Sequence, residues 1–503
     1  MRRRWLIGAL RIIAAIAVFV SPALWEFVHG PSLSSITGSD FWWHLRTGLE
    51  IVRTHTLPHT GWFSQSSAQR WIASSWLYDV RIAGWYQMLG LRSLPVLGSV
   101  AKFLLAVLTF LLARGLRGRF WMALALSAVT QYVLWQMPPL PVFCSVLALT
   151  IELILVFEFC KRGSVWALYS LPVLFPVWAN LDSRFVSGVL ILLLFAAACL
   201  AEQWGRRQAI AWLAWGGNEV RIKAVLATTA ASVITTCITP YGWKSYGVFW
   251  ANAISAANPY FPDYQSLRFR SPQDYVLMLL TMAAFLSLGM RRSRDLFQIA
   301  LLVLCTVAAF HAQRDAWLLT LAAVAVIANA APEEAPTREL RATSYEDPPA
   351  SFEPKATFLV AAGVSIVVLL GVLALRLPSQ EAVLTKIAAS YPVAAADYIR
   401  TNELPAPLFN SFPWGGFLAW YLPQYPVAID GRTDLYGPDF NIQYAKVMNA
   451  EAHYSTFAPL NDAGTILVEK NSLLGKALPS ARGFKTAYSD NVAIVLVRER
   501  EQP

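Results

Sequence analysis

The chain of 503 residues is 56% hydrophobic and only 14% charged, with a mean hydropathy of +0.45. Soluble proteins carry roughly 25% charged residues, so the composition excludes a soluble globular chain and predicts a polytopic α-helical membrane protein. The net charge of +10 does not indicate nucleic-acid binding, because the Lys and Arg residues form short clusters between apolar runs, as cytoplasmic loops of membrane proteins do.

A helix that crosses a bilayer needs roughly 20 apolar residues. The sequence predicts about eleven such helices, near residues 5–28, 94–113, 119–136, 140–159, 165–181, 184–203, 222–239, 274–290, 295–311, 315–331 and 356–377. If Arg2 to Arg4 are cytoplasmic, every rich basic cluster falls on the cytoplasmic side as well, which agrees with the positive-inside bias. Loops 29–93 and 240–273 and everything after residue 378 are then extracytoplasmic.

The segment from Trp71 to Gly90 is apolar but carries Asp79 and Arg81. A span here would move the basic cluster at Arg114 to Arg119 to the outside. The segment is therefore predicted to lie in the outer interface, where its Trp and Tyr side chains suit the headgroup region.

Composition divides the chain into four parts. These are a transmembrane domain over 1–331, a cytoplasmic linker over 332–355 rich in Pro, Glu and Ala, a last transmembrane helix over 356–377 and a C-terminal region over 378–503. In the last region short alternating apolar runs are separated by helical patterns. This indicates a small extracytoplasmic α/β domain of about 120 residues.

The first candidate site is the run from Ser39 to His44, just after the first span. A carboxylate at Asp40 can act as a general base towards a hydroxyl. His44 follows one helical turn later on the same face and can orient Asp40, bind a metal or contact a phosphate. The alternatives are that Ser39 or Asp40 caps an amphipathic helix over the run from Phe41 to Val52 and that His44 is an ordinary interfacial histidine.

The other outer turns supply further polar residues. The candidates for binding substrate or phosphate are Asp182, Arg184, Tyr241, Lys244, Asp263 and Arg314. The predicted topology places them on one face, where Arg184, Lys244 and Arg314 can bind a phosphate and Asp263 can assist. The alternative for Asp182 and Arg184 is that they pair with each other.

The C-terminal domain has candidates of its own. Trp414 lies at a Gly-rich helix start, and Asp430 and Arg432 follow a predicted strand. Ligands bind at the ends of strands in α/β sheets, so these three residues are candidates for an acceptor platform. The alternative is a turn that Asp430 and Arg432 stabilise.

Several longer runs occur in order along the chain: DFWWHLRTG, TLPHTGWFS, WIASSWLYDV, WANL, TPYGWK and IDGRTDLYG. With them the chain resembles uncharacterised bacterial membrane proteins of the GT-C type. That superfamily includes the protein mannosyltransferases and the lipid A aminoarabinose transferases, to which the similarity is weaker and rests on architecture.

The resemblance implies a multi-pass glycosyltransferase of the bacterial inner membrane, and the basic clusters predict a cytoplasmic N-terminus. It implies transfer of a sugar, with inversion, from a polyprenyl-phosphate donor to a glycan, lipid or protein acceptor at the outer face. Asp40 falls where the superfamily places its first-loop acid, so the family role of acceptor activation carries onto Asp40.

The sequence departs from the superfamily pattern at two positions. Ser39 stands where a second acid is common, so no metal ligand is assigned, no cofactor is certain and a divalent metal stays open. Asp182 stands where related chains often have His. The alternatives to an enzyme are a transporter or flippase of a lipid-linked glycan and a non-enzymatic envelope assembly protein. A cavity that opens to one face only would favour the enzyme.

Overall fold

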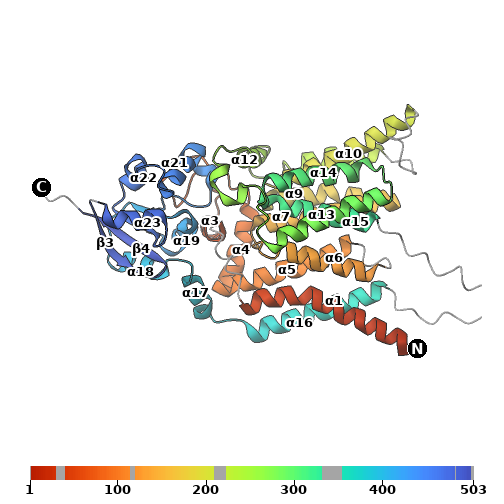
Figure 1. The fold of residues 1–503 in the computed structure, drawn as a ribbon, viewed down its shortest axis with the longest axis horizontal. Coiled ribbons are helices and arrows are strands. Elements are labelled where there is room, and N and C mark those ends of the chain that lie inside the picture. Colours follow the sequence, from red (N-terminus) through yellow and green to blue (C-terminus); the bar gives the residue numbers. More distant parts are fainter. Residues whose placement is uncertain are drawn as a thin grey trace, which may run out of the picture.

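The computed structural model describes residues 2–29, 40–113, 119–208, 222–330, 354–481 and 483–499. A bundle of long helices forms one end of the molecule and a smaller mixed domain forms the other, with two short helices between them (Figure 1). The predicted linker over 332–355 falls almost entirely outside the described residues, as do Ser39, Arg114 and Arg117.

The bundle contains apolar helices at every predicted span. They are α1 (Arg2–His29), α5 (Ser93–Leu112), α6 (Phe120–Val133), α7 (Pro141–Arg162), α8 (Val165–Tyr169), α9 (Leu171–Leu181), α10 (Phe185–Arg207), α11 (Ile222–Thr235), α13 (Pro272–Met290), α14 (Leu296–His311), α15 (Ala316–Ala330) and α16 (Pro354–Arg376). In the described part of the chain, six helical segments are long and apolar enough to cross a membrane. The helical membrane architecture is confirmed, while the number of eleven crossings stays a prediction.

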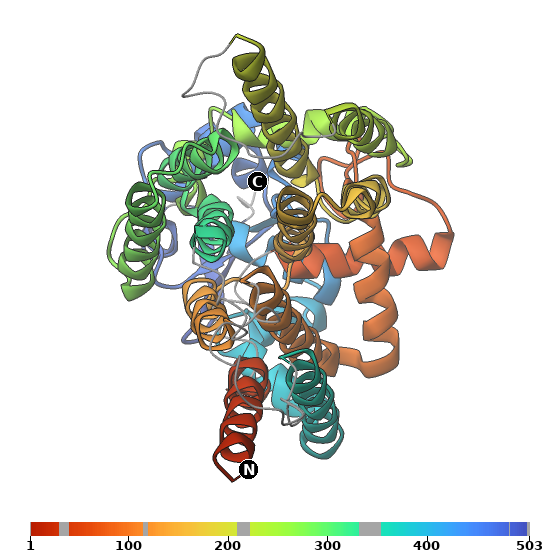
Figure 2. The same ribbon diagram turned by 90° about the vertical axis from the view of Figure 1, so that its right-hand side faces the viewer.

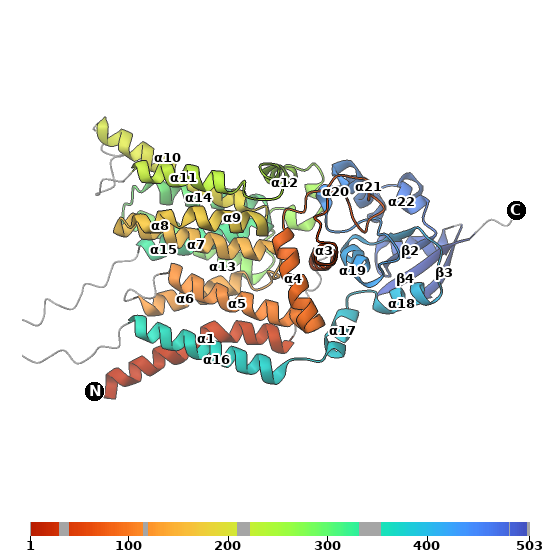
Figure 3. The same ribbon diagram turned by 180° about the vertical axis from the view of Figure 1, so that it is seen from behind.

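Helices α1, α5 and α16 form one side of the bundle and lie next to one another in Figures 1 and 3. Their contact is aromatic: the Phe110 ring stacks on Phe358 at 5.7 Å and meets the edge of Phe19 at 5.5 Å. Seen along the bundle in Figure 2, the N-terminal end of α1 and the adjacent α16 lie at one edge.

Basic residues gather at one end of the bundle. The basic residues that end α7 and α10, together with Arg291 and Arg292 after α13, all lie at the ends of these helices furthest from the C-terminal domain. This is the arrangement that the predicted topology requires.

Two helices lie across the other end of the bundle. These are α3 (Asp40–Thr54) and α4 (Trp76–Leu89). A 3-10 turn, η1 (Gly90–Arg92), joins α4 to α5. Figures 1 and 3 show α4 at a steep angle to α5, although together they form one continuous apolar helical stretch. A position across the bundle end is in keeping with the predicted interfacial placement.

The C-terminal domain contains the small sheet that the alternating runs predict. Its strands β1 (Leu408–Asn410), β2 (Thr465–Glu469), β3 (Phe484–Ser489) and β4 (Ala493–Arg498) are ordered β1-β2-β4-β3. Within this sheet β1 and β2 are parallel, with Phe409 opposite Ile466, and the other two pairs are antiparallel. The helices are α17 (Gln380–Ala388), α18 (Val393–Thr401), α19 (Phe412–Tyr421), α20 (Thr433–Tyr436), α21 (Pro438–Met448), α22 (Ala458–Asn461) and α23 (Leu473–Ala477).

The first loop packs directly onto this domain. Trp42 of α3 is fully buried and stacks on Trp420 of α19 at 4.7 Å. Further along the loop, Ser64 forms a parallel bridge with Val427, whose N–H donates to the Phe63 carbonyl at 3.0 Å. The first loop and the C-terminal domain therefore form one continuous structure above the bundle.

Candidate functional site

A cavity of about 510 Å³ lies between the bundle and the C-terminal domain. Its walls come from α3, α4, the turn before α10, α12 (Lys244–Ala253), the 3-10 turns η3 (Pro262–Tyr264) and η4 (Gln313–Asp315), and the loop that enters α20. The predicted site residues that line it are Asp40, His44, Asp182, Arg184, Asp263 and Arg314. Six candidates drawn from four separate stretches of sequence thus meet in one cavity.

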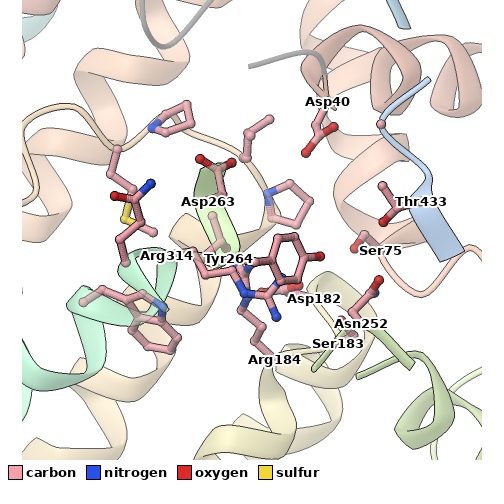
Figure 4. Close-up of a pocket in the computed structure, with 18 of the residues that line it drawn as sticks. Asp40, Ser75, Asp182, Ser183, Arg184, Asn252, Asp263, Tyr264, Arg314 and Thr433 are labelled. Carbon is pink, nitrogen blue, oxygen red and sulfur yellow. The ribbon is translucent and has the colours of Figure 1, made fainter. Parts of the chain in front are cut away.

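Asp40 begins α3 and faces the cavity, where Figure 4 shows it on the side that carries Ser75 and Thr433. The Trp43 indole donates to Asp40 Oδ1 at 3.2 Å. A carboxylate in the first turn of a helix is also favoured by the helix dipole. Asp40 is thus the first residue of α3 and also lines the cavity, and its capping role stays a prediction.

The C-terminal domain reaches Asp40 through a glycine. A Cβ atom placed on Gly431 would lie 1.8 Å from Asp40 Oδ1, so any side chain at this position would displace one of the two residues. The Gly431 backbone thus closes one side of the Asp40 carboxylate.

His44 is a buried, paired histidine. Its Nδ1 lies 2.6 Å from Asp79 Oδ1, and both side chains are almost completely buried. The Trp43 ring stacks on the imidazole at a centroid distance of 3.5 Å, and the Tyr78 ring meets its edge at 5.3 Å. His44 is therefore buried and paired, and its role in the reaction stays a prediction.

Two arginines gather at another part of the cavity. The Arg314 guanidinium lies 3.7 Å from the centre of the Tyr264 ring, and its Nε is buried without a hydrogen-bond partner. Figure 4 shows Arg184 close to the same tyrosine. Burial, followed by the positive charge of Arg184, lowers the pKa of Arg314. In the described residues neither arginine forms a direct ion pair, although the nearby Asp315 and Tyr264 act on Arg314 and Asp263 lines the same cavity.

Asp182 does not pair with Arg184. Its Oδ2 accepts a hydrogen bond from Ser145 at 2.6 Å, and Ser145 accepts one from the Trp178 indole, also at 2.6 Å. This buried chain fixes the turn between α9 and α10, and it leaves the Arg184 side chain available to the cavity.

The floor of the cavity follows the C-terminal end of α6. The buried Lys102 of α5 donates to the carbonyls of Leu134 and Trp135, at 3.0 and 2.6 Å. A lysine at this position satisfies carbonyls that the end of a helix leaves unpaired. The backbone of residues 134–138 is thereby held at the cavity wall.

Five predicted residues do not line the cavity. Lys244 is exposed at the start of α12. Tyr241 donates to the Pro58 carbonyl at 3.0 Å, and burial raises its pKa to about 12. Trp414 is buried and donates to the Ser390 carbonyl at 3.1 Å.

The other two, Asp430 and Arg432, form a buried ion pair with a distance of 2.6 Å between Arg432 Nη2 and Asp430 Oδ2. Arg432 also donates to the carbonyl of Trp62 in the first loop at 2.8 Å. The turn of the alternative interpretation is therefore present, and it also joins the domain to the first loop.

Sequence reasoning missed the residues around that pair. Gly431, Thr433 and Asp434 line the cavity, and burial raises the pKa of Asp434 to about 6. It also missed Asp79 as the partner of His44, although an acid inside an apolar segment is a recognisable signal. In the described residues no group of three or more His, Cys, Asp and Glu side chains is placed to hold a metal ion, and no metal ligand is assigned.

Comparison with solved structures shows which fold this is. The archaeal oligosaccharyltransferase AglB from Archaeoglobus fulgidus, solved with an inhibitory peptide and a dolichol-phosphate, is 11% identical with a TM-score of 0.50 over 93% of this chain and 69% of that chain. The fold is of the GT-C type.

ArnT from Cupriavidus metallidurans also matches. Bound to undecaprenyl phosphate it is 13% identical with a TM-score of 0.45 over 99% of this chain and 98% of that chain. In the apo state it is 15% identical with a TM-score of 0.43. Comparison with protein-family profiles and with curated protein sequences finds no match.

Proposed function

We propose that the protein is a glycosyltransferase that moves a sugar from a polyprenyl-phosphate donor to an acceptor at the outer face of the inner membrane. The observation that carries the proposal is the division of one cavity into two parts. Asp40 lies at one part, and two arginines without carboxylate partners lie at another.

The arginines suit the phosphate of the donor. Two guanidinium groups that repel each other are stabilised by an anion between them, and guanidinium groups bind phosphate oxygens through paired hydrogen bonds. As the bond between the anomeric carbon and the phosphate breaks, the electron pair stays on the phosphate, and Arg184 and Arg314 stabilise the developing charge.

Asp40 suits the acceptor. A carboxylate that takes the proton from a hydroxyl as it attacks the anomeric carbon is a general base, and the Trp43 hydrogen bond orients it. Direct displacement with inversion needs base and leaving group on opposite sides of the sugar, and the cavity offers both. The dolichol-phosphate bound to AglB supports the choice of a polyprenyl-phosphate donor.

The position of the cavity favours transfer over transport. It lies at the bundle end away from the basic helix ends, which is the outer side if the positive-inside rule holds for this chain. A flippase site is expected near the middle of the membrane between matching halves.

The test is transfer of labelled sugar from a panel of polyprenyl-phosphate donors into membrane extract, with the full-length protein in lipid bilayers. Wild-type protein should transfer from at least one donor, and Asp40→Asn should lose at least roughly 100-fold in rate. Glu50→Gln, which removes a carboxylate elsewhere on α3, is the matched control and should keep its rate. Equal rates for wild type and Asp40→Asn would remove Asp40 from the mechanism, and no transfer from any donor would refute the proposal.

A further inference from the structure

The pair formed by His44 and Asp79 is the feature of the cavity that the proposed transfer leaves unused. Both residues line the cavity, and the 2.6 Å contact joins His44 Nδ1 to Asp79 Oδ1. In the described residues Nε2, on the other side of the ring, has no hydrogen-bond partner. One nitrogen of the ring is therefore engaged and the other is available.

The two helices approach closely so that this contact can form. A Cβ atom on Gly48 of α3 would lie 1.9 Å from the Asp79 carbonyl oxygen, so only glycine allows α3 to lie against α4 here. Tyr78, next to Asp79, donates to the Pro139 carbonyl at 2.6 Å and holds α4 to the loop before α7.

The imidazole itself has little freedom to rotate. It is stacked against Trp43 on one face and meets the Tyr78 ring at its edge. Asp79 is completely buried, and its Oδ2 has no hydrogen-bond partner. A buried carboxylate is costly unless it is paired, so Asp79 holds strongly to the N–H of His44.

We propose that Asp79 is a positioning residue for His44, an inference that rests on the proposed transfer. Asp79 keeps Nδ1 of His44 protonated. Nε2 is then free to receive the proton that the acceptor hydroxyl releases in the reaction. The acceptor oxygen bonds to the anomeric carbon, and the carbon–phosphate oxygen bond breaks with its electrons on the phosphate. The hydroxyl proton moves to Asp40 and then to Nε2, which lies one helical turn away. The resulting imidazolium is stabilised by Asp79, and Asp40 is again a carboxylate.

The charges around the His44 ring favour transfer of the proton from Asp40 to the imidazole. Asp40 lies one helical turn before the ring on α3 and lines the same cavity, while Asp79 and the neutral Tyr78 contact the ring from α4. From the C-terminal domain, Asp434 lines the same cavity. Burial raises the pKa of Asp79, and the charge and hydrogen bond of His44, together with the charge of Arg432, oppose that rise. An imidazolium at this position therefore has several carboxylates near it, and one cation, Arg432, acts on Asp79.

The first arm of the test does not require turnover. Full-length protein labelled with ¹⁵N-histidine in lipid nanodiscs is compared with His44→Gln, which identifies the His44 signals. We expect Nδ1 protonated and Nε2 unprotonated in the wild type at neutral pH. In Asp79→Asn the amide N–H₂ should reverse the tautomer, whereas the control Glu50→Gln should leave it as it is. An unchanged tautomer in Asp79→Asn, or an unprotonated Nδ1 in the wild type, would overturn the proposal.

The second arm measures transfer from the polyprenyl-phosphate panel between pH 5 and 9. We expect Asp79→Asn and His44→Gln each to lower the rate by roughly 100-fold, to change the pH profile and to leave KM for the donor unchanged. The double variant should be no slower than either single one, because the two residues act as a unit. An unchanged pH profile would show that the pair is only structural and would contradict the proposal. If wild-type protein transfers no sugar, the proposed function fails, and the first arm still decides whether Asp79 fixes the ring.

Discussion

At the scale of single residues, the contact between Gly431 and Asp40 has the clearest consequence. An alanine at position 431 would place its Cβ 1.8 Å from the Asp40 carboxylate, so either the carboxylate or the loop before α20 must move. We expect Gly431→Ala to lower the transfer rate by at least roughly 10-fold, because small displacements of a base are costly. Thermal unfolding should show that the protein remains folded.

Gly84→Ala is the matched control, since a Cβ atom there meets no atom within 4 Å. It should keep the wild-type rate. If Gly431→Ala were equally active, the close approach of the C-terminal domain would have no role in the reaction.

Asp434 gives a prediction about pH. Burial raises its pKa from 3.8 to about 6, so the folded protein binds this proton more tightly than the unfolded chain does. The stabilisation is complete below about pH 4 and is lost as the pH rises through 6. We expect Asp434→Asn to stabilise the protein at pH 7.5 by on the order of 1 to 2 kcal/mol, after allowance for solvent screening, and not at pH 4.

The measurement for Asp434 is the unfolding temperature of wild type and variant at both pH values. Asp439→Asn, at an exposed carboxylate on α21, is the control. Its unfolding temperature should differ from that of the wild type by the same small amount at both pH values. A gain for Asp434→Asn that is equal at both pH values would contradict the raised pKa.

The sequence predicts the charged residues of the cavity better than their contacts. Asp182, Arg184 and Arg314 lie in turns between apolar spans, and topology alone places such turns on one face. The ion pair of Asp430 with Arg432 and the pairing of His44 with Asp79 depend on how side chains pack across segments far apart in sequence, which no local pattern specifies.

At the scale of elements, α3 is held between the bundle and the C-terminal domain. Trp42 is buried among Tyr391, Phe417 and Trp420, at ring distances of 5.8, 5.4 and 4.7 Å. We expect Trp42→Ala to destabilise the protein by about 3 to 5 kcal/mol, because it leaves a large cavity. Thermal unfolding of the protein in detergent measures this loss.

Trp243→Ala is the comparison, since Trp243 at the start of α12 is 74% exposed within the protein. It should change the unfolding temperature much less. Equal effects of the two substitutions would show that α3 does not depend on the aromatic contacts of Trp42.

Most elements follow from local sequence patterns and a few do not. All eleven apolar runs are helices, and the run from Phe41 to Val52 is the predicted amphipathic helix. The predicted strand around Val427 is only a single bridge, because its partner is the first loop and not the sheet. Sheet order is likewise non-local, since β1 pairs with a strand that begins 55 residues after β1 ends.

At the scale of the whole molecule, the C-terminal domain and the first loop behave as one unit joined at Arg432. Its guanidinium binds Asp430 and the Trp62 carbonyl and lies over the Trp71 ring at 5.0 Å. We expect Arg432→Gln to leave a buried charge unpaired and to cost about 3 to 5 kcal/mol. Limited proteolysis of the full-length protein should then cut the first loop and the domain at the same rate.

Arg400→Gln removes the partner of Asp397 on the exposed surface of α18 and serves as the control. This variant should leave both the first loop and the C-terminal domain resistant to proteolysis. Cleavage of the domain in Arg432→Gln while the first loop stays protected would mean that the two are separate units.

The contacts of the first loop also determine when the site can form. Gln65, Arg432 and Tyr436 make hydrogen bonds that join residues 343 to 372 positions apart. At roughly 5 to 20 residues per second, a ribosome needs on the order of 20 to 70 seconds to add that length of chain. The segment that carries Asp40 is therefore made early and waits, already past the first span, for the end of the chain. An incomplete or truncated chain cannot assemble the cavity, so membrane insertion is finished before the chemistry can begin.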